Sequence, residues 1–258
     1  MALTIRLSLF LLSSASFVCV SISQKVGGPQ GPLTSHFIDW LAAHGYEQDQ
    51  FERPEIGPNG SFGGKRRHGE RITNEPVIFI HGNGDTALYT QAPLATGWSR
   101  KVLKGGELIG TDGNCSLGPP LTKHIDTFLG ISGPNYGLCV CQLAQTVPAW
   151  CNALDGLYPG YTCQDQMLCG YTAGNCKQEN YSALLEKLNN APAREADHVY
   201  AMWSDVDEVL LFRGLTWGKP TSRIPGMNGR WISDRNSHIA MKDLTELRQY
   251  EAVVHHSI

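Results

Sequence analysis

The sequence predicts an α/β fold with a mostly parallel sheet flanked by helices, and two observations support this prediction. The apolar run at 76–80 lacks the alternation of a half-exposed strand, which is typical of strands buried on both faces, and the stretches 125–132 and 198–203 are consistent with two further strands. Helical and loop segments separate these runs. Strands that alternate with such segments favour parallel pairing.

Composition limits the classes of protein to be considered. The 258 residues carry a formal net charge of −3 and 17% charged residues, with 28 glycines. The absence of a basic excess argues against nucleic acid as a partner. Low charge and abundant glycine favour a loop-rich secreted protein. We expect residues 24–258 to form a single domain.

Residues 1–23 are predicted to be a secretory signal peptide. Arg6 is the only charge in the first 24 residues, and Leu7–Val20 is an apolar stretch interrupted by serines. This stretch is too short to span a bilayer, and no later segment approaches spanning length. The sequence therefore predicts an extracellular protein whose mature chain begins near Gln24, with no transmembrane segment.

The cysteines are consistent with an extracellular protein. Cys19 leaves with the signal peptide, and an oxidising environment favours disulfides among the other seven. A zinc site that uses cysteines together with His255 and His256 is the alternative, but paired C-x-x-C units are absent. Because seven is odd, one thiol must be free, intermolecular or without its partner. The candidates are Cys115, Cys139, Cys141, Cys151, Cys163, Cys169 and Cys176.

Three N-x-S/T sequons, at Asn59, Asn114 and Asn180, are candidate glycosylation sites. They agree with a secreted glycoprotein.

In the first part of the chain we expect a helix over Thr34–His44, stopped by Gly45, and then a loop over 54–71. A buried strand over 76–80 follows and ends in the turn His81-Gly82-Asn83-Gly84. A glycine turn at the carboxyl end of such a strand can direct backbone amides at a developing oxyanion.

In the middle of the chain we expect a loop over 85–99 and a short helical fragment over 100–104. A loop over 111–120 leads to a second strand over 125–132. Residues 134–180 hold six of the seven mature cysteines and little hydrophobic periodicity. We interpret them as a Cys-rich, disulfide-stapled excursion from the domain.

The last part of the chain is predicted to contain a helix over 181–189, a strand over 198–203, a loop over 214–231 and an amphipathic terminal helix over 242–255.

An acidic loop after the third strand and a histidine before the last helix are the candidate catalytic residues. Asp207 followed later by His238 has the chain order of acid and histidine in α/β-hydrolases. The histidine takes the proton of a nucleophile, and the acid orients and stabilises it. Asp205 is the second choice for the acid, although on a continued strand it would point to the other face.

Several stretches resemble the secreted class 2 lipases, which are triacylglycerol-lipase-like α/β-hydrolases, and the resemblance runs from about Thr34 to the C-terminus. It implies an α/β-hydrolase-type sheet and hydrolysis of carboxylic esters of lipids without a metal or other cofactor. It also implies Asp207 and His238 as acid and base, with the amide of Asn83 as an oxyanion donor. The stretches are 77–84, 110–115, 128–139, 204–207 and 243–245.

The serine nucleophile of that family is absent from this sequence. Its elbow reads Gly-x-Ser-x-Gly or Ala-x-Ser-x-Gly, whereas the matching frame at 170–174 carries Thr172. Ser99 lacks the second glycine. Ser132 follows a strand but precedes Gly133-Pro134, which cannot open a helix smoothly.

Spacing accounts for this absence. The fold needs roughly 50 residues or more between the His-Gly turn and the elbow. The chain offers nineteen, His81 to Ser99, before Arg100. By resemblance, residues 95–98 belong to the helix after the turn and 100–106 to the helix after the nucleophile. The sequence thus predicts an internal deletion near 99–100 and a sheet truncated in the middle.

The predicted function is that of a secreted lipase- or esterase-like hydrolase, in a form that lacks its nucleophile. The alternative is a non-catalytic secreted pseudoenzyme that binds lipid or protein.

Overall fold

The computed structural model describes residues 32–46, 51–55, 60–73, 75–78, 80, 100–101, 103–111, 113–143, 148–160, 169 and 181–258. The chain divides into two compact units, one comprising Met1–Val77 with Ala87–Tyr89 and the other Ile78–Thr86 with Thr90–Ile258. A single domain over 24–258 therefore stays a prediction.

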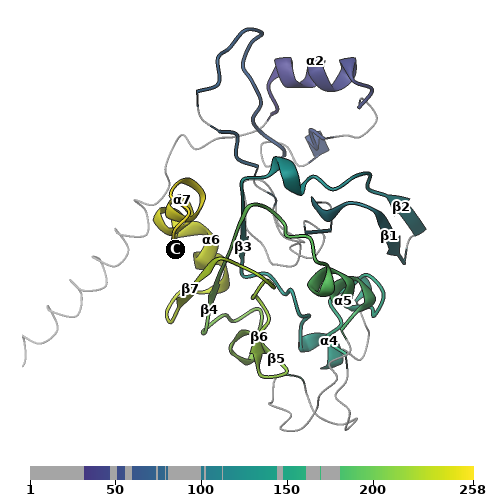
Figure 1. Ribbon diagram of the computed structural model, residues 1–258, viewed down its shortest axis with the longest axis vertical. Coiled ribbons are helices and arrows are strands. Elements are labelled where there is room, and N and C mark those ends of the chain that lie inside the picture. The colour runs from purple at the N-terminus through teal and green to yellow at the C-terminus, as the bar shows by residue number, and fades with distance from the viewer. Residues whose placement is uncertain are drawn as a thin grey trace, which may run out of the picture. The chain divides into compact units, whose positions relative to one another are not determined.

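The first unit contains the predicted N-terminal helix, α2, at Ser35–Ala43 (Figure 1). The hydroxyl of Thr34 accepts a hydrogen bond from the amide of Phe37 and so caps the first turn. Gly45 follows the helix with φ of 80°, a conformation that costs glycine nothing. The prediction of a helix over Thr34–His44 is confirmed.

The predicted buried strand at 76–80 is wrong for the residues described there. Residues 76–78 and 80 are in no strand, and Val77, Ile78 and Ile80 are 55%, 79% and 61% exposed. A continuous apolar run forms a buried strand only where neighbouring strands satisfy its amides and carbonyls. The described residues supply no such partner here.

The second unit is built on a three-stranded parallel sheet, in the order β3 (Thr127–Ile131), β4 (His198–Ser204) and β7 (Gly229–Ser233). Val199 to Ser204 of β4 are all buried, because this central strand is covered on both faces. The predictions of strands near 125–132 and 198–203 are confirmed.

Two helices close the chain against this sheet, α6 (His238–Asp243) against β4 and α7 (Glu246–Val254) against β3 (Figure 1). On β4, Val199, Ala201 and Trp203 pack with Ile224 in one apolar cluster. α5 (Ala183–Asn190) contributes Leu185 to a second cluster.

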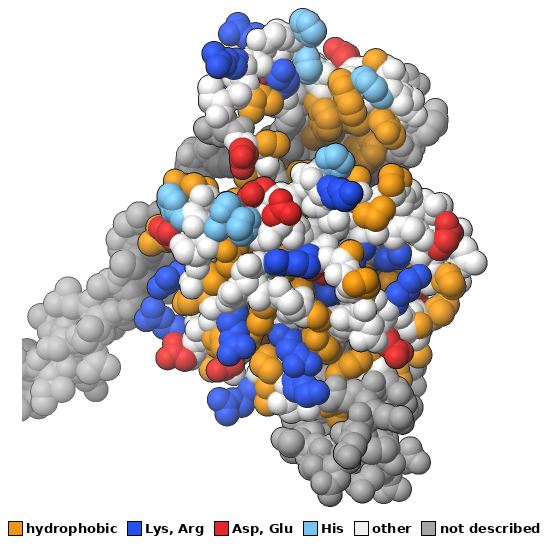
Figure 2. Space-filling view, in the orientation of Figure 1, with side chains coloured by type: hydrophobic (Ala, Val, Ile, Leu, Met, Phe, Trp, Pro, Cys, Tyr) orange, Lys and Arg blue, Asp and Glu red, His pale blue; other side chains and the backbone are white. Residues whose placement is uncertain are grey.

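The single terminal helix predicted over 242–255 is instead two helices, because the chain breaks at Leu244-Thr245. Its predicted apolar face is largely exposed: Leu244 and Leu247 are 70% and 68% exposed, and Tyr250 is 53% exposed. Figure 2 shows that hydrophobic side chains reach the surface at many points of the face it draws. Helical periodicity predicted a helix and its apolar face. Periodicity does not show which other elements of the fold cover that face.

Short strands in predicted loops were missed. β1 (Glu107–Gly110) and β2 (Gly113–Ser116) form an antiparallel hairpin, and β5 (Leu215–Thr216) pairs with β6 (Lys219–Pro220). β7 begins inside the predicted loop over 214–231 and extends past the end of that loop. These strands have two to five residues, too few for periodicity to distinguish them from loop.

Disulfides link the Cys-rich segment as predicted, at Cys139–Cys169 and Cys141–Cys151. Cys141–Cys151 joins the short helices α4 (Val140–Leu143) and η5 (Ala149–Cys151). Cys115 is a free, exposed thiol among the described residues. The disulfide candidates Cys163 and Cys176 lie outside those residues.

Two further short 3₁₀ helices complete the described elements, η4 (Thr122–His124) and η6 (Phe212–Gly214). Within the described part of the chain, every helix is too short or too polar to cross a bilayer.

Candidate active site

Parallel pairing of β4 with β7 brings the predicted acid and histidine together. Ser204 and Ser233, the last residues of the two strands, are partners in the register. Asp207 follows Ser204 by three residues, and His238 follows Ser233 by five and begins α6. Both residues therefore lie at the carboxyl edge of the sheet, where α/β folds place their chemistry.

The two side chains form a tight pair. Oδ2 of Asp207 lies 2.6 Å from Nδ1 of His238. The side chain of Asp207 is fully buried and that of His238 is 11% exposed. A carboxylate on Nδ1 places the proton there and leaves Nε2 as the basic nitrogen, as a general base requires.

The other carboxylate oxygen of Asp207 is held by the backbone. Oδ1 accepts hydrogen bonds from the amides of Val209 at 2.9 Å and Leu210 at 2.8 Å. The rotamer of Asp207 is thus fixed from both sides, which orients the imidazole before any substrate arrives.

Glu208 also contacts His238, which no motif in the sequence indicated. Its Oε2 accepts a hydrogen bond from the backbone amide of His238 at 2.9 Å. Ser237 caps the same helix by accepting from Ala240. Asp205, the second choice for the acid, is half-buried, and its amide bonds to the carbonyl of Ser233. Of the two aspartates, Asp207 is the one that contacts His238.

An open hollow of about 590 Å³ adjoins Asp207. Its lining combines apolar side chains with charged ones. Its lining residues are Asp205, Val206, Asp207, Leu211, Phe212, Arg213 and Asp234.

One wall of the hollow has an unusual backbone. Leu211, Phe212 and Arg213 have φ of 57°, 45° and 59°, and Gly214 continues the run at 66°. Non-glycine residues in this region cost about 1–3 kcal/mol each and concentrate near functional sites.

No serine of the described region is hydrogen-bonded to His238. Ser132 follows β3 with φ of 49°, but it is buried, and its Oγ has no hydrogen-bond partner among the described residues. Its amide is bound to the carbonyl of Met202. The frame at 170–174 and Ser99 lie outside the described residues, as do His81, Gly82 and Asn83 of the predicted oxyanion turn.

A buried ion cluster anchors the chain just after Ser99. Nε of Arg100 lies 2.8 Å from Oε1 of Glu195, and Nζ of Lys104 lies 3.1 Å from the same oxygen. Arg100 also donates to Asn135 and Asn189. Burial alone would raise the pKa of Glu195, but the charges and hydrogen bonds of Arg100 and Lys104 outweigh it and hold that pKa below its usual value.

Of the predicted glycosylation sites, Asn114 is exposed on β2, and Asn59 and Asn180 lie outside the described residues. Glycosylation stays a prediction.

A parallel sheet with a buried acid after one strand and a histidine after the next defines the acid–base half of a hydrolase triad. The family model "Lipase (class 2)" matches residues 92–251, more than half of the chain, so this protein belongs to the class 2 lipase family. By family it is a lipase- or esterase-like hydrolase. The chain has no match among the curated proteins or the solved structures.

The match confirms the resemblance to class 2 lipases over residues 92–251. It includes Asp207 and His238, and it begins after the turn His81–Gly84. The oxyanion role of Asn83 therefore stays a prediction.

Proposed function

We propose that this chain is a secreted form of a lipid carboxylic-ester hydrolase, from a family that serves lipid catabolism, and that it retains the acid–base pair but not the nucleophile. The observation that carries this proposal is the Asp207–His238 pair, built as a general base at the correct edge of the sheet. The sequence offers that base no serine on a strand–turn–helix elbow. A base without its nucleophile loses most of a triad enzyme's rate enhancement.

Exposed apolar surface supports the loss of an internal segment near 99–100. Val77, Ile78 and Ile80 are exposed although their pattern is that of a buried strand. Among the described residues, β3 pairs only with β4, so its other edge has no strand beside it. The strand that leads to the serine elbow would pair at that edge. Leu244 and Leu247 are uncovered as well. The loss of a strand and of its helices would expose these apolar residues to solvent.

Ester turnover tests the proposal. The purified chain should hydrolyse p-nitrophenyl butyrate at the rate of its own His238→Ala variant, because Nε2 of His238 has no hydroxyl to activate. Glu186→Gln, a substitution in α5 outside the site, serves as the matched control. Turnover that exceeds background in the parent and the control but disappears in His238→Ala would overturn the proposal.

A second candidate function is non-catalytic binding of lipid or protein. The hollow beside Asp207 favours it, since Val206, Leu211 and Phe212 supply apolar surface there. Val206→Asp with Leu211→Asp should abolish cosedimentation with phosphatidylcholine vesicles if lipid occupies the hollow. Equal cosedimentation of the parent and this variant would exclude the hollow as a lipid site.

A further inference from the structure

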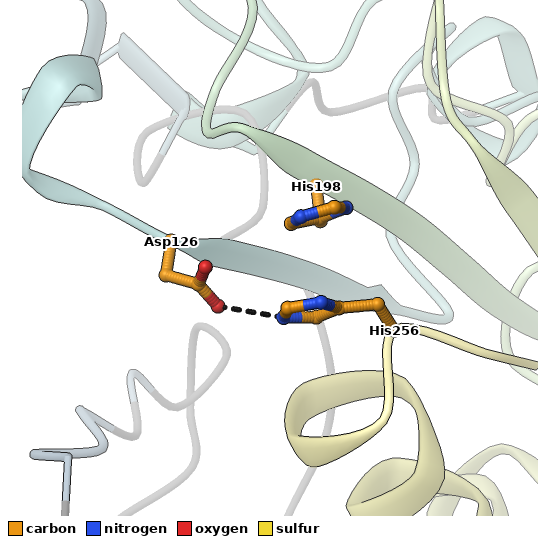
Figure 3. Close-up of side chains that lie close together, drawn as sticks. All are labelled: Asp126, His198 and His256. Atoms are coloured by element: carbon orange, nitrogen blue, oxygen red, sulfur yellow. Dashed lines mark hydrogen bonds and ion pairs between the residues drawn. The ribbon is translucent and has the colours of Figure 1, made fainter.

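A cluster of two histidines and one aspartate lies at the amino edge of the parallel sheet, opposite the edge that holds Asp207. Asp126 immediately precedes β3, His198 is the first residue of β4, and His256 follows α7. One ligand atom from each of the three lies within 4.8 Å of the other two. Figure 3 shows the two imidazole rings stacked, with the carboxylate of Asp126 facing their edge.

The backbone holds the cluster in place. The amide of His198 donates to the carbonyl of Asp126 at 2.8 Å, and Thr127 is the register partner of His198. Oη of Tyr200, also on β4, donates to the carbonyl of His256. Three chain segments that are far apart in the sequence are therefore held beside one another, two of them by a main-chain hydrogen bond and the third by the hydroxyl of Tyr200.

The side chains lie close together, but the two stacked rings do not yet direct their nitrogen lone pairs, which lie in the ring planes, at one point. The ring centroids of His198 and His256 are 3.8 Å apart, with 12° between the ring planes. Nε2 of His256 lies 2.9 Å from Oδ2 of Asp126, which also accepts a hydrogen bond from Thr127 at 2.7 Å. These hydrogen bonds, that from Thr127 first and then that from His256, hold the pKa of Asp126 below its usual value.

From this geometry we propose that Asp126, His198 and His256 bind a divalent zinc ion. Zinc takes imidazole nitrogens and carboxylate oxygens at about 2.0–2.2 Å, which places neighbouring ligand atoms of a tetrahedral site about 3.4 Å apart. To bind the ion, the ligand atoms must approach one another from at most 4.8 Å, and at least one of the stacked rings must rotate. Asp126 and His256 are exposed enough to rotate, with side chains 47% and 35% exposed.

The donor set selects the class of metal. Two nitrogens and one oxygen suit zinc and neighbouring transition metals, whereas calcium and magnesium prefer oxygen ligands alone. Three protein ligands leave a fourth position for water. Because the ligands join the start of β3 and β4 to the C-terminal segment, the bound ion would fasten residues after α7 to the sheet.

This site differs from the cysteine–histidine site considered in the sequence analysis. Cys139, Cys141, Cys151 and Cys169 are in disulfides and are therefore not available as zinc ligands. His256 instead meets an aspartate and a histidine whose pairing depends on the parallel register of β3 and β4.

Zinc binding to the full chain tests the proposal. Thiols, including that of Cys115, are first blocked with N-ethylmaleimide, and metal is removed with EDTA. Calorimetric titration with zinc chloride should give one site, and zinc but not calcium should raise the melting temperature. His198→Asn, His256→Asn and Asp126→Asn should each weaken binding by about 100-fold or more, since even the outer partners of metal ligands contribute about 10–100-fold.

His255→Asn, a change at the neighbouring exposed histidine, is the matched control and should bind zinc like the parent. Circular dichroism of each variant without metal shows whether its fold is retained, and His256→Asn, at an exposed position after the last helix, should retain it. No zinc binding by the parent, or undiminished binding by His256→Asn, would overturn the proposal.

Discussion

Oδ2 of Asp207 lies 2.6 Å from Nδ1 of His238, although the two residues come from different strand ends. The parallel register of β4 and β7 produces this contact, because it aligns Ser204 with Ser233 and brings the following loops together. The pair is buried, and its acid is fixed by two backbone amides. A buried carboxylate–imidazole pair is thus assembled in a chain whose sequence lacks the serine elbow.

The pair should be measurable as a stability coupling even without catalysis. Asp207→Ala removes the acceptor of three hydrogen bonds in a buried place and should cost about 2–4 kcal/mol in urea unfolding. Asp205→Ala, its half-buried neighbour, should cost less than about 1 kcal/mol. A double-mutant cycle with His238→Ala should give a coupling of about 1 kcal/mol or more. Additive losses would show that the contact contributes nothing.

The buried ion cluster should be the largest single electrostatic contribution in the second unit. Glu195→Gln leaves the charge of Arg100 buried without its counter-ion and should cost about 3–5 kcal/mol. Lys104→Met should cost less, because Arg100 still pairs with Glu195. Trp203, buried in the central strand, provides a fluorescence probe for the unfolding. Equal losses in both variants would contradict this assignment.

The same cluster predicts a pH dependence. The pKa of Glu195 is lower in the folded chain than its unfolded value of about 4.3. The stabilisation is therefore fully present above pH 4.3 and is lost as the pH falls through the folded pKa. Between about pH 5 and pH 3, the free energy of unfolding should fall more steeply in the parent than in Glu195→Gln. Parallel curves would rule out Glu195 as the source.

Each disulfide should stabilise the Cys-rich segment according to the length of its loop. Cys141–Cys151 spans 10 residues and Cys139–Cys169 spans 30. The chain-entropy model gives about 3 and about 4 kcal/mol respectively. Paired Cys→Ser variants at each bridge measure these values in urea without reductant. Cys115→Ser, at the free thiol, is the control and should leave the unfolding curve unchanged.

Exposure of the apolar run at 76–80 can be tested by polar substitution. Ile78→Ser should change the free energy of unfolding by less than about 0.5 kcal/mol, because that side chain is 79% exposed. Val199→Ser, in the fully buried central strand, should cost more than about 2 kcal/mol. A loss at Ile78 as large as that at Val199 would instead restore the buried strand that the sequence predicts.

The sequence predicted those features that local chemistry determines. Helix α2 has a threonine cap and a glycine stop, and β4 is a continuous apolar run, so both were predicted near their observed bounds. The pairing of Asp207 with His238 could be predicted because their chain order is that of the acid and histidine in α/β-hydrolases, and their catalytic roles stay a prediction. Strand formation at 76–80 could not be decided in this way, because it depends on partners elsewhere in the sheet.

Other features depended on tertiary contacts with no local signal. The exposure of one face of α7 depends on which elements pack against it, and the hydrogen bond from His238 to Glu208 depends on the loop that follows β4. The cluster of Asp126, His198 and His256 joins positions up to 130 residues apart through the strand register. Of these three residues, only His256 was considered a possible metal ligand from the sequence, as part of the pair His255-His256.

Reaction with a fluorophosphonate ester, followed by mass spectrometry of the intact chain, tests the central claim most directly. Such probes label a serine only where a general base activates it, and a commercial serine lipase treated in parallel verifies the reagent. We predict no phosphonyl adduct on this chain, in the parent or in His238→Ala. A stoichiometric serine adduct that forms in the parent and is lost in His238→Ala would contradict the claim that the nucleophile is missing.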